Sequence, residues 1–351
     1  MYTAFAWGVF VPPREILSMM DRVAALLCAC VAFVGATACK SHSPAPTGSG
    51  APPHRRQIAV VPKGTTHEFW KSVHAGAVKA SRERGVEIVW KGPVREDDRA
   101  EQIRVVEDFV SKHVDAIALA PLDDTALVPA AKEATSEKIP VVIVDSDIKW
   151  DGRVSFVATD NEQAGAAAAR HLGTLLGGKG NVLVLRYQEG SGSTMAREKG
   201  FLETIAKDYP TIKVVSDNQY GGATTESAYQ TAESLLVKFV QLDGVFCPNE
   251  STTFGMLRAL EDARRAGKVS FVGFDASAKL VEALDKGEID GLVVQDPFAM
   301  GERGVAALVY HLDGKPVEPR IDTGVTIVTK KNMAEPRIHT LLAPDLAAWL
   351  N

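Results

Sequence analysis

The sequence predicts an α/β protein built from two doubly wound, parallel-sheet domains. From Gln57 onward, short and almost entirely apolar segments alternate with amphipathic ones. Apolar strands alternating with helices are typical of parallel sheets that helices cover on both faces. The predicted strands, about ten in two similar runs, are more than one sheet commonly holds. A chain of 351 residues is also long enough for two domains of ordinary size.

The first run follows a strand, turn and helix around the segment 64–70. Its predicted strands cover 58–61, 86–90, 115–120 and 140–144. The helix after the opening turn is predicted to end at Arg84, and two further helices are predicted over 98–112 and 126–137. Thr65 and Glu68 have the spacing of a capping box at the start of the first helix, and Gly85 is expected to end it.

The second run repeats this alternation. Its predicted strands cover 181–185, 212–215, 244–247, 269–275, 291–295 and 325–328. Its predicted helices cover 161–176, 195–207, 225–239, 252–265, 277–286 and 298–312. The strand at 325–328 is the last element that the pattern predicts.

The N-terminal segment has the features of a secretory signal. Arg22 precedes an apolar run, and the small residues 36–38 lead into Cys39. A cysteine directly after such a cleavage site resembles a bacterial lipobox, which implies a signal peptide over 1–38 and lipid attachment at Cys39. The run is shorter than the ~20 residues of a membrane-spanning helix, although an uncleaved anchor is the alternative. Residues 1–18 fit no signal pattern, so Met19 or Met20 is a candidate start.

Residues 39–56 are predicted to be a lipidated cysteine followed by a flexible tether, because the segment is rich in Pro, Ser and Gly. An anchor, a tether and a globular body together indicate a protein that works outside the cytoplasm, in the periplasm or at the cell surface. The sequence does not distinguish the inner from the outer membrane.

Composition and motifs argue against several functions. The net charge of −5 comes with no basic run, which is evidence against a nucleic-acid partner. Cys247 is the one cysteine of the body, so an internal disulfide is excluded there, and no Cys/His cluster has zinc spacing. We expect no metal and no cofactor. The chain lacks a nucleophile elbow, a Walker loop and a dinucleotide fingerprint, and we therefore expect no enzymatic activity.

Polar side chains gather where the predicted strands end, which is where open α/β sheets bind ligands. Carboxylates, amides and a guanidinium match sugar hydroxyls, which both donate and accept hydrogen bonds. Flat aromatic rings can cover the apolar face of a sugar ring. The residues of these types at the strand ends are His67, Phe69, Trp70, Asp145, Ser146, Arg197, Asn249, Asp275 and Gln295.

Each of these residues also has a purely structural interpretation. Asp145 and Asp275 could be helix N-caps, and Asn249 could be a turn residue. Phe69 could fill the core, whereas Trp70 lies one position off the apolar stripe of its helix. The functional interpretation therefore depends on the joint placement of these residues.

The body resembles the periplasmic sugar-binding proteins of the ribose-binding type, the solute receptors of ABC transporters. The resemblance rests on segments 58–76, 142–145, 158–161, 197–201, 246–250, 273–275 and 294–297, which follow one another in the family's order. The family's fold implies two lobes joined by a three-strand hinge. The expected lobes are 57–159 plus 296–322 and 160–295 plus 323–351.

The resemblance also implies roles for individual positions. His67 stands where the family has an asparagine, and Phe69 and Trp70 stand where it has stacking aromatics. Ser146 replaces an arginine of the family, and Glu250 replaces an aspartate. The implied ligand-binding residues are His67, Phe69, Trp70, Asp145, Ser146, Arg197, Tyr220, Asn249, Asp275 and Gln295, with Tyr220 the candidate for a phenylalanine between the lobes.

The expected function is that of a lipid-anchored, monomeric receptor that binds a sugar or small polyol and delivers it to an ABC transporter permease. One alternative is a sensor that presents a quorum signal or nucleoside to a membrane receptor kinase. A second alternative is a sugar-acting enzyme. The changes at the first turn and at Ser146 argue against ribose itself as the ligand.

Overall fold

The structure is a computed structural model that describes residues 55–350. The expected signal peptide, the lipidation site Cys39 and all of the tether except Arg55 and Arg56 lie outside the described residues. Residues 53–351 cluster as one compact unit. Among residues 55–350, no helix is both long enough and apolar enough to cross a membrane.

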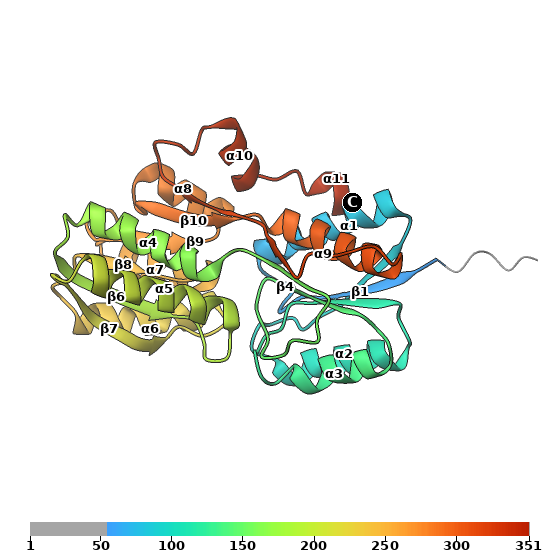
Figure 1. Cartoon of the computed structure of the whole chain (residues 1–351). Coiled ribbons are helices and arrows are strands. Elements are labelled where there is room, and N and C mark those ends of the chain that lie inside the picture. Colours follow the sequence, from blue (N-terminus) through green and yellow to red (C-terminus); the bar gives the residue numbers. More distant parts are fainter. Residues whose placement is uncertain (1–54, 351) are drawn as a thin grey trace, which may run out of the picture. The chain divides into compact units, whose positions relative to one another are not determined.

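The first of two sheets, to which β1 and β4 in Figure 1 belong, has six strands, all parallel. Their order is β11-β5-β4-β3-β1-β2. The strands are β1 (Gln57–Val61), β2 (Glu87–Trp90), β3 (Ala116–Leu119), β4 (Val141–Val144), β5 (Ser155–Ala158) and β11 (Arg320–Asp322). The covering helices are α1 (Glu68–Arg84), α2 (Arg99–Ser111), α3 (Val128–Ser136) and α9 (Pro297–Leu312).

Both faces of the first sheet are buried because its strands are apolar on both sides. Ile58 of β1 packs into a core with Ala77 of α1 and Leu308 of α9. The next residue, Ala59, points to the opposite face and packs with Phe109 of α2. This alternation along one strand explains the continuous apolar runs in the sequence.

The second sheet has the order β12-β10-β9-β8-β6-β7, and only the β10–β12 pair is antiparallel. Its strands are β6 (Gly180–Arg186), β7 (Ile212–Tyr220), β8 (Gly244–Phe246), β9 (Ser270–Phe274), β10 (Gly291–Gln295) and β12 (Val325–Val328). Helices α4 (Asn161–Leu175) and α5 (Gly192–Asp208) pack in one core. The other face packs α6 (Thr225–Lys238), α7 (Glu250–Asp262) and α8 (Ala278–Lys286).

These two sheets confirm the predicted fold class, since both are mainly parallel and covered by helices on both faces. The strands are ordered alike in the two sheets. In the first sheet β1 lies between β2 and β3, and in the second sheet β6 lies between β7 and β8. In such an order the connections reverse direction beside the first strand, and a crevice forms there at the carboxyl ends of the strands.

Some local predictions differ from the structure. Strands β5 and β11 were not predicted, and both lie toward one edge of the first sheet. Helix α5 begins at Gly192, three residues before the predicted start, and Ser191 is its N-cap. The capping box is wrong: His67 is the N-cap of α1, with no side-chain cap bond. Gly85 does end α1, in a left-handed conformation with φ 67°.

The chain passes between the two sheets at three short connections, after β5, after β10 and between β11 and β12. Two further helices follow, α10 (Pro336–Leu342) and α11 (Ala347–Leu350). Helix α10 contacts β10 of the second sheet, whereas α11 contacts α1 beside the first. The C-terminal segment therefore crosses once more, which the expected lobe range of 323–351 does not include.

Candidate functional site

Polar side chains from the strand ends of both sheets surround a cavity of about 30 Å³. It is lined by Lys63, His67, Phe69, Trp70, Glu96, Asp145, Tyr187, Ser193, Thr194, Arg197, Asn249, Glu250, Asp275 and Gln295. Eight of the ten predicted site residues belong to this lining. The other two are Ser146 and Tyr220.

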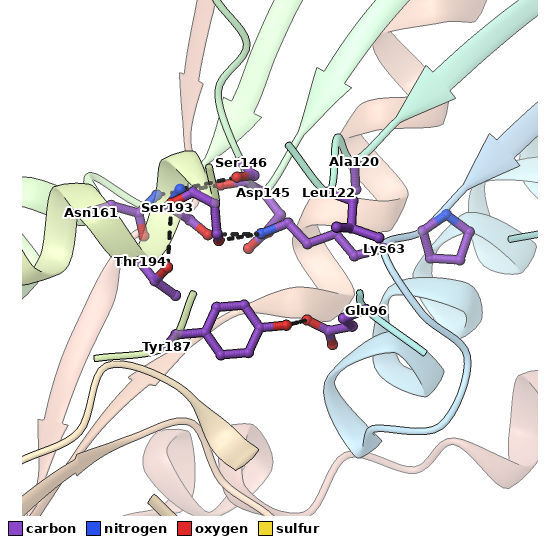
Figure 2. A network of polar contacts seen from close by, with 12 residues as sticks. Lys63, Glu96, Ala120, Leu122, Asp145, Ser146, Asn161, Tyr187, Ser193 and Thr194 are labelled. Carbon is purple, nitrogen blue, oxygen red and sulfur yellow. Dashed lines mark hydrogen bonds and ion pairs between the residues drawn. The ribbon is translucent and has the colours of Figure 1, made fainter. Parts of the chain in front are cut away.

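Lys63 joins the two sheets at the site. It lies two residues beyond β1 and is only 3% exposed. Its Nζ lies 3.1 Å from Asp145 Oδ2 and donates to Ser191 Oγ at 3.3 Å and Ser193 Oγ at 3.0 Å (Figure 2). A buried ammonium group is stable only when paired and hydrogen-bonded. Lys63 has both kinds of partner, and its serine partners come from the second-sheet side.

Glu96 is a second buried link between the sheets. Its two carboxylate oxygens accept hydrogen bonds from Trp70 Nε1 and from the Tyr187 hydroxyl, each at 2.7 Å, and Figure 2 shows the Tyr187 bond. His67 Nδ1 lies 2.6 Å from Glu96 Oε1. Tyr187 follows β6, so this cluster also spans the two sheets.

The proximity of His67 and Glu96 determines the charge state of both side chains. Burial alone would lower the pKa of His67, but the Glu96 carboxylate outweighs burial and raises that pKa to about 9. Burial would raise the pKa of Glu96, but the neighbouring His67 and Lys63 charges lower it to about 2. At neutral pH the site therefore holds an imidazolium–carboxylate pair.

Arg197 organises the part of the site that belongs to the second sheet. Its Nε donates to Asn161 Oδ1 at 2.8 Å, its Nη1 to the Pro248 carbonyl at 2.9 Å and its Nη2 to Gln295 Oε1 at 2.9 Å. The guanidinium carbon also lies 4.1 Å from the centre of the Phe274 ring. Burial lowers the pKa of Arg197 despite the carboxylates nearby.

Glycines allow α4 and α5 to approach closely enough to place Arg197. A Cβ at Gly165 of α4 would lie 1.9 Å from the Arg197 carbonyl oxygen, and one at Gly200 of α5 would lie 2.0 Å from the Glu162 carbonyl. Real Cβ contacts are never this short. Only glycine therefore fits at these two positions.

Asp275 completes the Arg197 network. Its Oδ1 accepts from Gln295 Nε2 at 2.6 Å, and its Oδ2 accepts from the Glu250 backbone N–H at 3.0 Å. Burial raises the pKa of Asp275, although Arg197 and the Gln295 hydrogen bond oppose this. The N-cap interpretation fails for Asp275, because Ser277 is the N-cap of α8.

Asp145 and Asp275 share an unusual backbone conformation. Each directly follows a strand, β4 and β9 respectively, and their φ angles are 63° and 68°. Non-glycine residues seldom adopt this left-handed region, and such residues gather at functional sites. The backbone geometry thus marks the same two positions as the residue types do.

Asn249 and Glu250 follow β8. The N-cap of α7 is Asn249, whose Oδ1 accepts from the Thr252 backbone N–H at 3.3 Å. Its local structural role is therefore real, and it still lines the cavity. Burial raises the pKa of Glu250 to about 7. One of its oxygens accepts from the Phe69 backbone N–H at 3.4 Å, across the two sheets.

Trp70 and Phe69 have different surroundings. Trp70 lies one position off the apolar stripe of α1, yet it is only 2% exposed and is hydrogen-bonded to Glu96. Its helix position turns the indole inward over the end of the sheet, where Phe69 meets it edge-on at 4.9 Å. Phe69 lines the cavity and is the better placed of the two rings to cover a ligand.

The two remaining predicted residues lie outside the cavity lining. Ser146 Oγ accepts a hydrogen bond from the Ser193 backbone N–H at 3.0 Å. Tyr220 lies at the end of the edge strand β7, is 39% exposed and packs under Arg186. Among the lining residues, the aromatic group that the second sheet contributes is Tyr187.

Sequence reasoning missed six lining residues as site residues: Lys63, Glu96, Tyr187, Ser193, Thr194 and Glu250. Lys63 and Tyr187 carried a usable signal, because each closely follows the first strand of its run. Glu96 lies in the loop between β2 and α2 and had no such signal. Within residues 55–350, no group of three His, Cys, Asp or Glu side chains could hold a metal ion.

Comparisons with known proteins agree with this geometry. The family model described as "Periplasmic binding protein domain" matches residues 58–316. The D-ribose/D-allose-binding protein of Pseudomonas aeruginosa is 30% identical over 315 residues, covering 85% of this chain and 97% of that protein.

Solved structures are similar over the same body. A solute-binding protein of an ABC transporter from Agrobacterium vitis, with bound D-fucose, is 37% identical with a TM-score of 0.79 and covers 82% of this chain and 100% of that one. A carbohydrate transporter solute-binding protein from Agrobacterium radiobacter, in complex with D-arabinose, is 32% identical with a TM-score of 0.81 and covers 83% and 100%.

Proposed function

The chain belongs to the periplasmic binding protein family, of the ribose-binding type, and from this premise we propose that it binds a sugar or small polyol between two lobes. The observation that carries the proposal is the cluster of buried, hydrogen-bonded polar side chains at the strand ends of both sheets. Hydroxyl groups of a sugar match such carboxylate, amide and guanidinium partners. The sugars bound by the similar proteins support the same ligand class.

We assign the ligand contacts to the residues that line the cavity. Asp145, Arg197, Asn249 and Asp275 offer hydrogen-bonding groups, and Phe69 offers a ring face. Further polar contacts come from His67 and from three residues beyond the sequence prediction, which are Lys63, Glu96 and Tyr187. Each hydrogen bond to a charged group contributes ~1.5–3 kcal/mol, so several suffice for micromolar affinity at about −8 kcal/mol.

Ligand entry requires movement of the two sheets. A cavity of about 30 Å³ has room for about one water molecule. A sugar ring can therefore enter only when the contacts of Lys63 with Ser193 and of Tyr187 with Glu96 are broken. We propose that ligand hydroxyls replace these contacts when the lobes close again.

The lobes of this proposal are 57–159 plus 296–322 and 160–295 plus 323–351, except that α11 packs against α1 of the first lobe. The hinge lies at the three connections between the sheets. Two of the connections, after β5 and between β11 and β12, are joined to one another, because Thr159 Oγ1 donates to the Gly324 carbonyl at 3.2 Å and Arg320 Nη2 to the Thr159 carbonyl at 2.9 Å. Short connections that absorb a change in φ and ψ are typical of hinge closure.

We further propose that the protein is a monomeric receptor anchored outside the cytoplasm by a lipid on Cys39 and that it delivers its ligand to an ABC transporter permease. Metabolic labelling with an alkyne fatty acid tests the anchor. Label and membrane association should both be lost in Cys39→Ser, while unchanged labelling of that variant would exclude Cys39 as the lipidation site.

Calorimetric titration of the body, residues 55–351, with pentoses, hexoses and polyols tests the ligand class. We expect heat and a micromolar or tighter Kd with at least one of them, and no turnover of the bound compound. An absence of binding across the panel, together with binding of another class such as a nucleoside, would overturn the proposal.

A further inference from the structure

A second and much larger cavity adjoins the polar site. Its volume is about 530 Å³, and it shares Phe69, Asp275 and Gln295 with the lining of the polar cavity. These three side chains lie between the two cavities, so a group attached to a sugar ring in the polar site would reach the larger cavity past them.

The walls of the larger cavity are mainly apolar. One wall consists of the C-terminal segment around α10, with Met333, Leu342 and Leu346. The opposite wall includes Val281 of α8 and Val294 of β10. An apolar cavity of about 150 Å³ already accommodates a benzene ring, so the available space exceeds that of a phenyl or butyl group.

The larger cavity suits an apolar group better than a second sugar ring. Buried hydroxyl groups without hydrogen-bond partners are strongly unfavourable, and most of this lining offers none. Its polar residues are Glu68, Ser72, Ser277 and His339, besides the shared Asp275 and Gln295. Ser72 of α1 is 4% exposed, and its Oγ has no hydrogen-bond partner among residues 55–350, so it is available to one ligand oxygen.

The C-terminal wall is fixed at both of its ends. Strand β12 pairs with β10 in the second sheet. At the other end, Arg82 of α1 donates from Nη1 to the Ala348 carbonyl and from Nη2 to the Trp349 carbonyl, each at 3.1 Å. The Arg82 guanidinium also lies 5.5 Å from the centre of the Trp349 ring. The cavity is thus bounded by a segment held against both halves of the site.

From the adjacency of the two cavities and the mainly apolar lining of the larger one, we infer that the protein's ligand is a sugar or polyol carrying an apolar substituent, such as an alkyl or aryl glycoside, with the substituent in the larger cavity. The inference rests on the proposed function, because the polar site must hold the sugar part. Each methylene group buried in the cavity should tighten binding by up to about fourfold.

Calorimetry with matched ligands tests the inference. D-fucose and D-arabinose would be compared with their methyl, n-butyl and phenyl glycosides in both anomeric forms. We expect at least one butyl or phenyl glycoside to bind at least tenfold more tightly than the corresponding methyl glycoside and free sugar.

Two variants locate the substituent. Ala343→Phe fills part of the larger cavity and should abolish the tenfold gain while leaving the affinity for the free sugar within twofold. Val237→Phe is the matched control, because Val237 is 80% exposed and belongs to neither cavity lining. The gain should persist in this control.

The outcomes separate the two proposals. Free sugars that bind at least as well as every glycoside would overturn the inference and leave the proposed function intact. A gain that survives in Ala343→Phe would also overturn it, because the substituent would then lie elsewhere. If neither sugars nor glycosides bind, the proposed function fails and the inference fails with it.

Discussion

The two sheets have the same strand order but contribute different kinds of polar group to the site. In the second sheet, Arg197, Gln295 and Asp275 are bonded to one another. On the first-sheet side, Lys63 and Glu96 direct several of their bonds across to Ser193 and Tyr187. The Arg197 network lies within the second-sheet side and can therefore persist when the two lobes separate. Lys63 and Glu96 on the first-sheet side would then lose their partners across the site.

Equivalent strands make this difference specific. Strands β4 and β9 occupy the same place in their sheets, and each is followed by an aspartate with positive φ. Strands β3 and β8 are also equivalent, but β3 is followed by the buried Ala120 and Leu122, and β8 by Asn249 and Glu250. The shared scaffold places strand ends alike, and the local residues decide what each end can bind.

Breaking the persistent network should have the largest effect. Arg197→Met would leave Gln295, Asn161 and Asp275 without a buried cationic partner. Removing one partner from such a buried network typically costs about 3–5 kcal/mol of unfolding free energy. Urea denaturation measures this loss.

Arg258→Met is the control for that variant. Arg258 pairs with Glu226 at 3.3 Å, but the two side chains are 40% and 76% exposed. We expect a change of less than about 1 kcal/mol there. Equal losses of unfolding free energy in Arg197→Met and Arg258→Met would show that the Arg197 network stabilises the protein no more than an ordinary surface pair does.

The His67–Glu96 pair predicts a pH dependence of stability. The pKa of His67 is raised from 6.5 to about 9 in the folded protein, so its contribution is complete below pH 6.5 and is lost as the pH rises through 9. At 1.36 kcal/mol for each tenfold change in proton affinity, the loss is about 3 kcal/mol. The unfolding free energy at pH 6 and pH 10 measures it.

Other groups titrate in the same range, so the comparison is between the wild type and His67→Gln. The variant has no proton to lose at this position and should show a smaller decrease between pH 6 and pH 10. If the unfolding free energy decreased equally in the wild type and in His67→Gln, His67 would not carry the charge that the His67–Glu96 pair requires.

A smaller effect is expected for a contact between the sheets. Tyr187→Phe removes one hydrogen bond to the buried Glu96 carboxylate, which is worth about 1.5–3 kcal/mol. Small-angle scattering without ligand should show a larger radius of gyration for the variant. An unchanged radius would mean that this contact does not hold the closed arrangement.

Thr231→Val is a suitable control for Tyr187→Phe. Thr231 Oγ1 bonds only to backbone carbonyls of the second-sheet side, those of Tyr220 and Ser227. Loss of these bonds should leave the radius of gyration unchanged.

The sequence predicted the fold and much of the site for physical reasons. Buried parallel strands are recognisable by their apolar runs, and polar residues directly after a strand, such as Asp145 and Asp275, occupy predictable places. Ser146 and Tyr220 were harder, because adjacent residues at a strand end point in different directions. Glu96 could not be predicted, since a long-range partnership with Tyr187 brings it to the site from a loop.

The structure also explains why Trp70 is buried although it lies off the apolar stripe of its helix. A helical pattern shows which positions share a face, but the indole is drawn inward by its hydrogen bond to Glu96. That bond depends on a residue 26 positions away. The apolar cavity was missed for a similar reason, because α10 and α11 follow the last strand and no periodicity predicted where they pack.

The most direct test of the account is the ligand affinity of Asp275→Ala, measured by calorimetry with any sugar that binds the wild type. Asp275 joins Gln295 and the backbone of Glu250 at the lining of the polar cavity. We predict that the variant stays folded and binds the sugar more than about tenfold less tightly, which corresponds to at least about 1.4 kcal/mol. Unchanged affinity in a folded variant would contradict the claim that these strand ends form the ligand site.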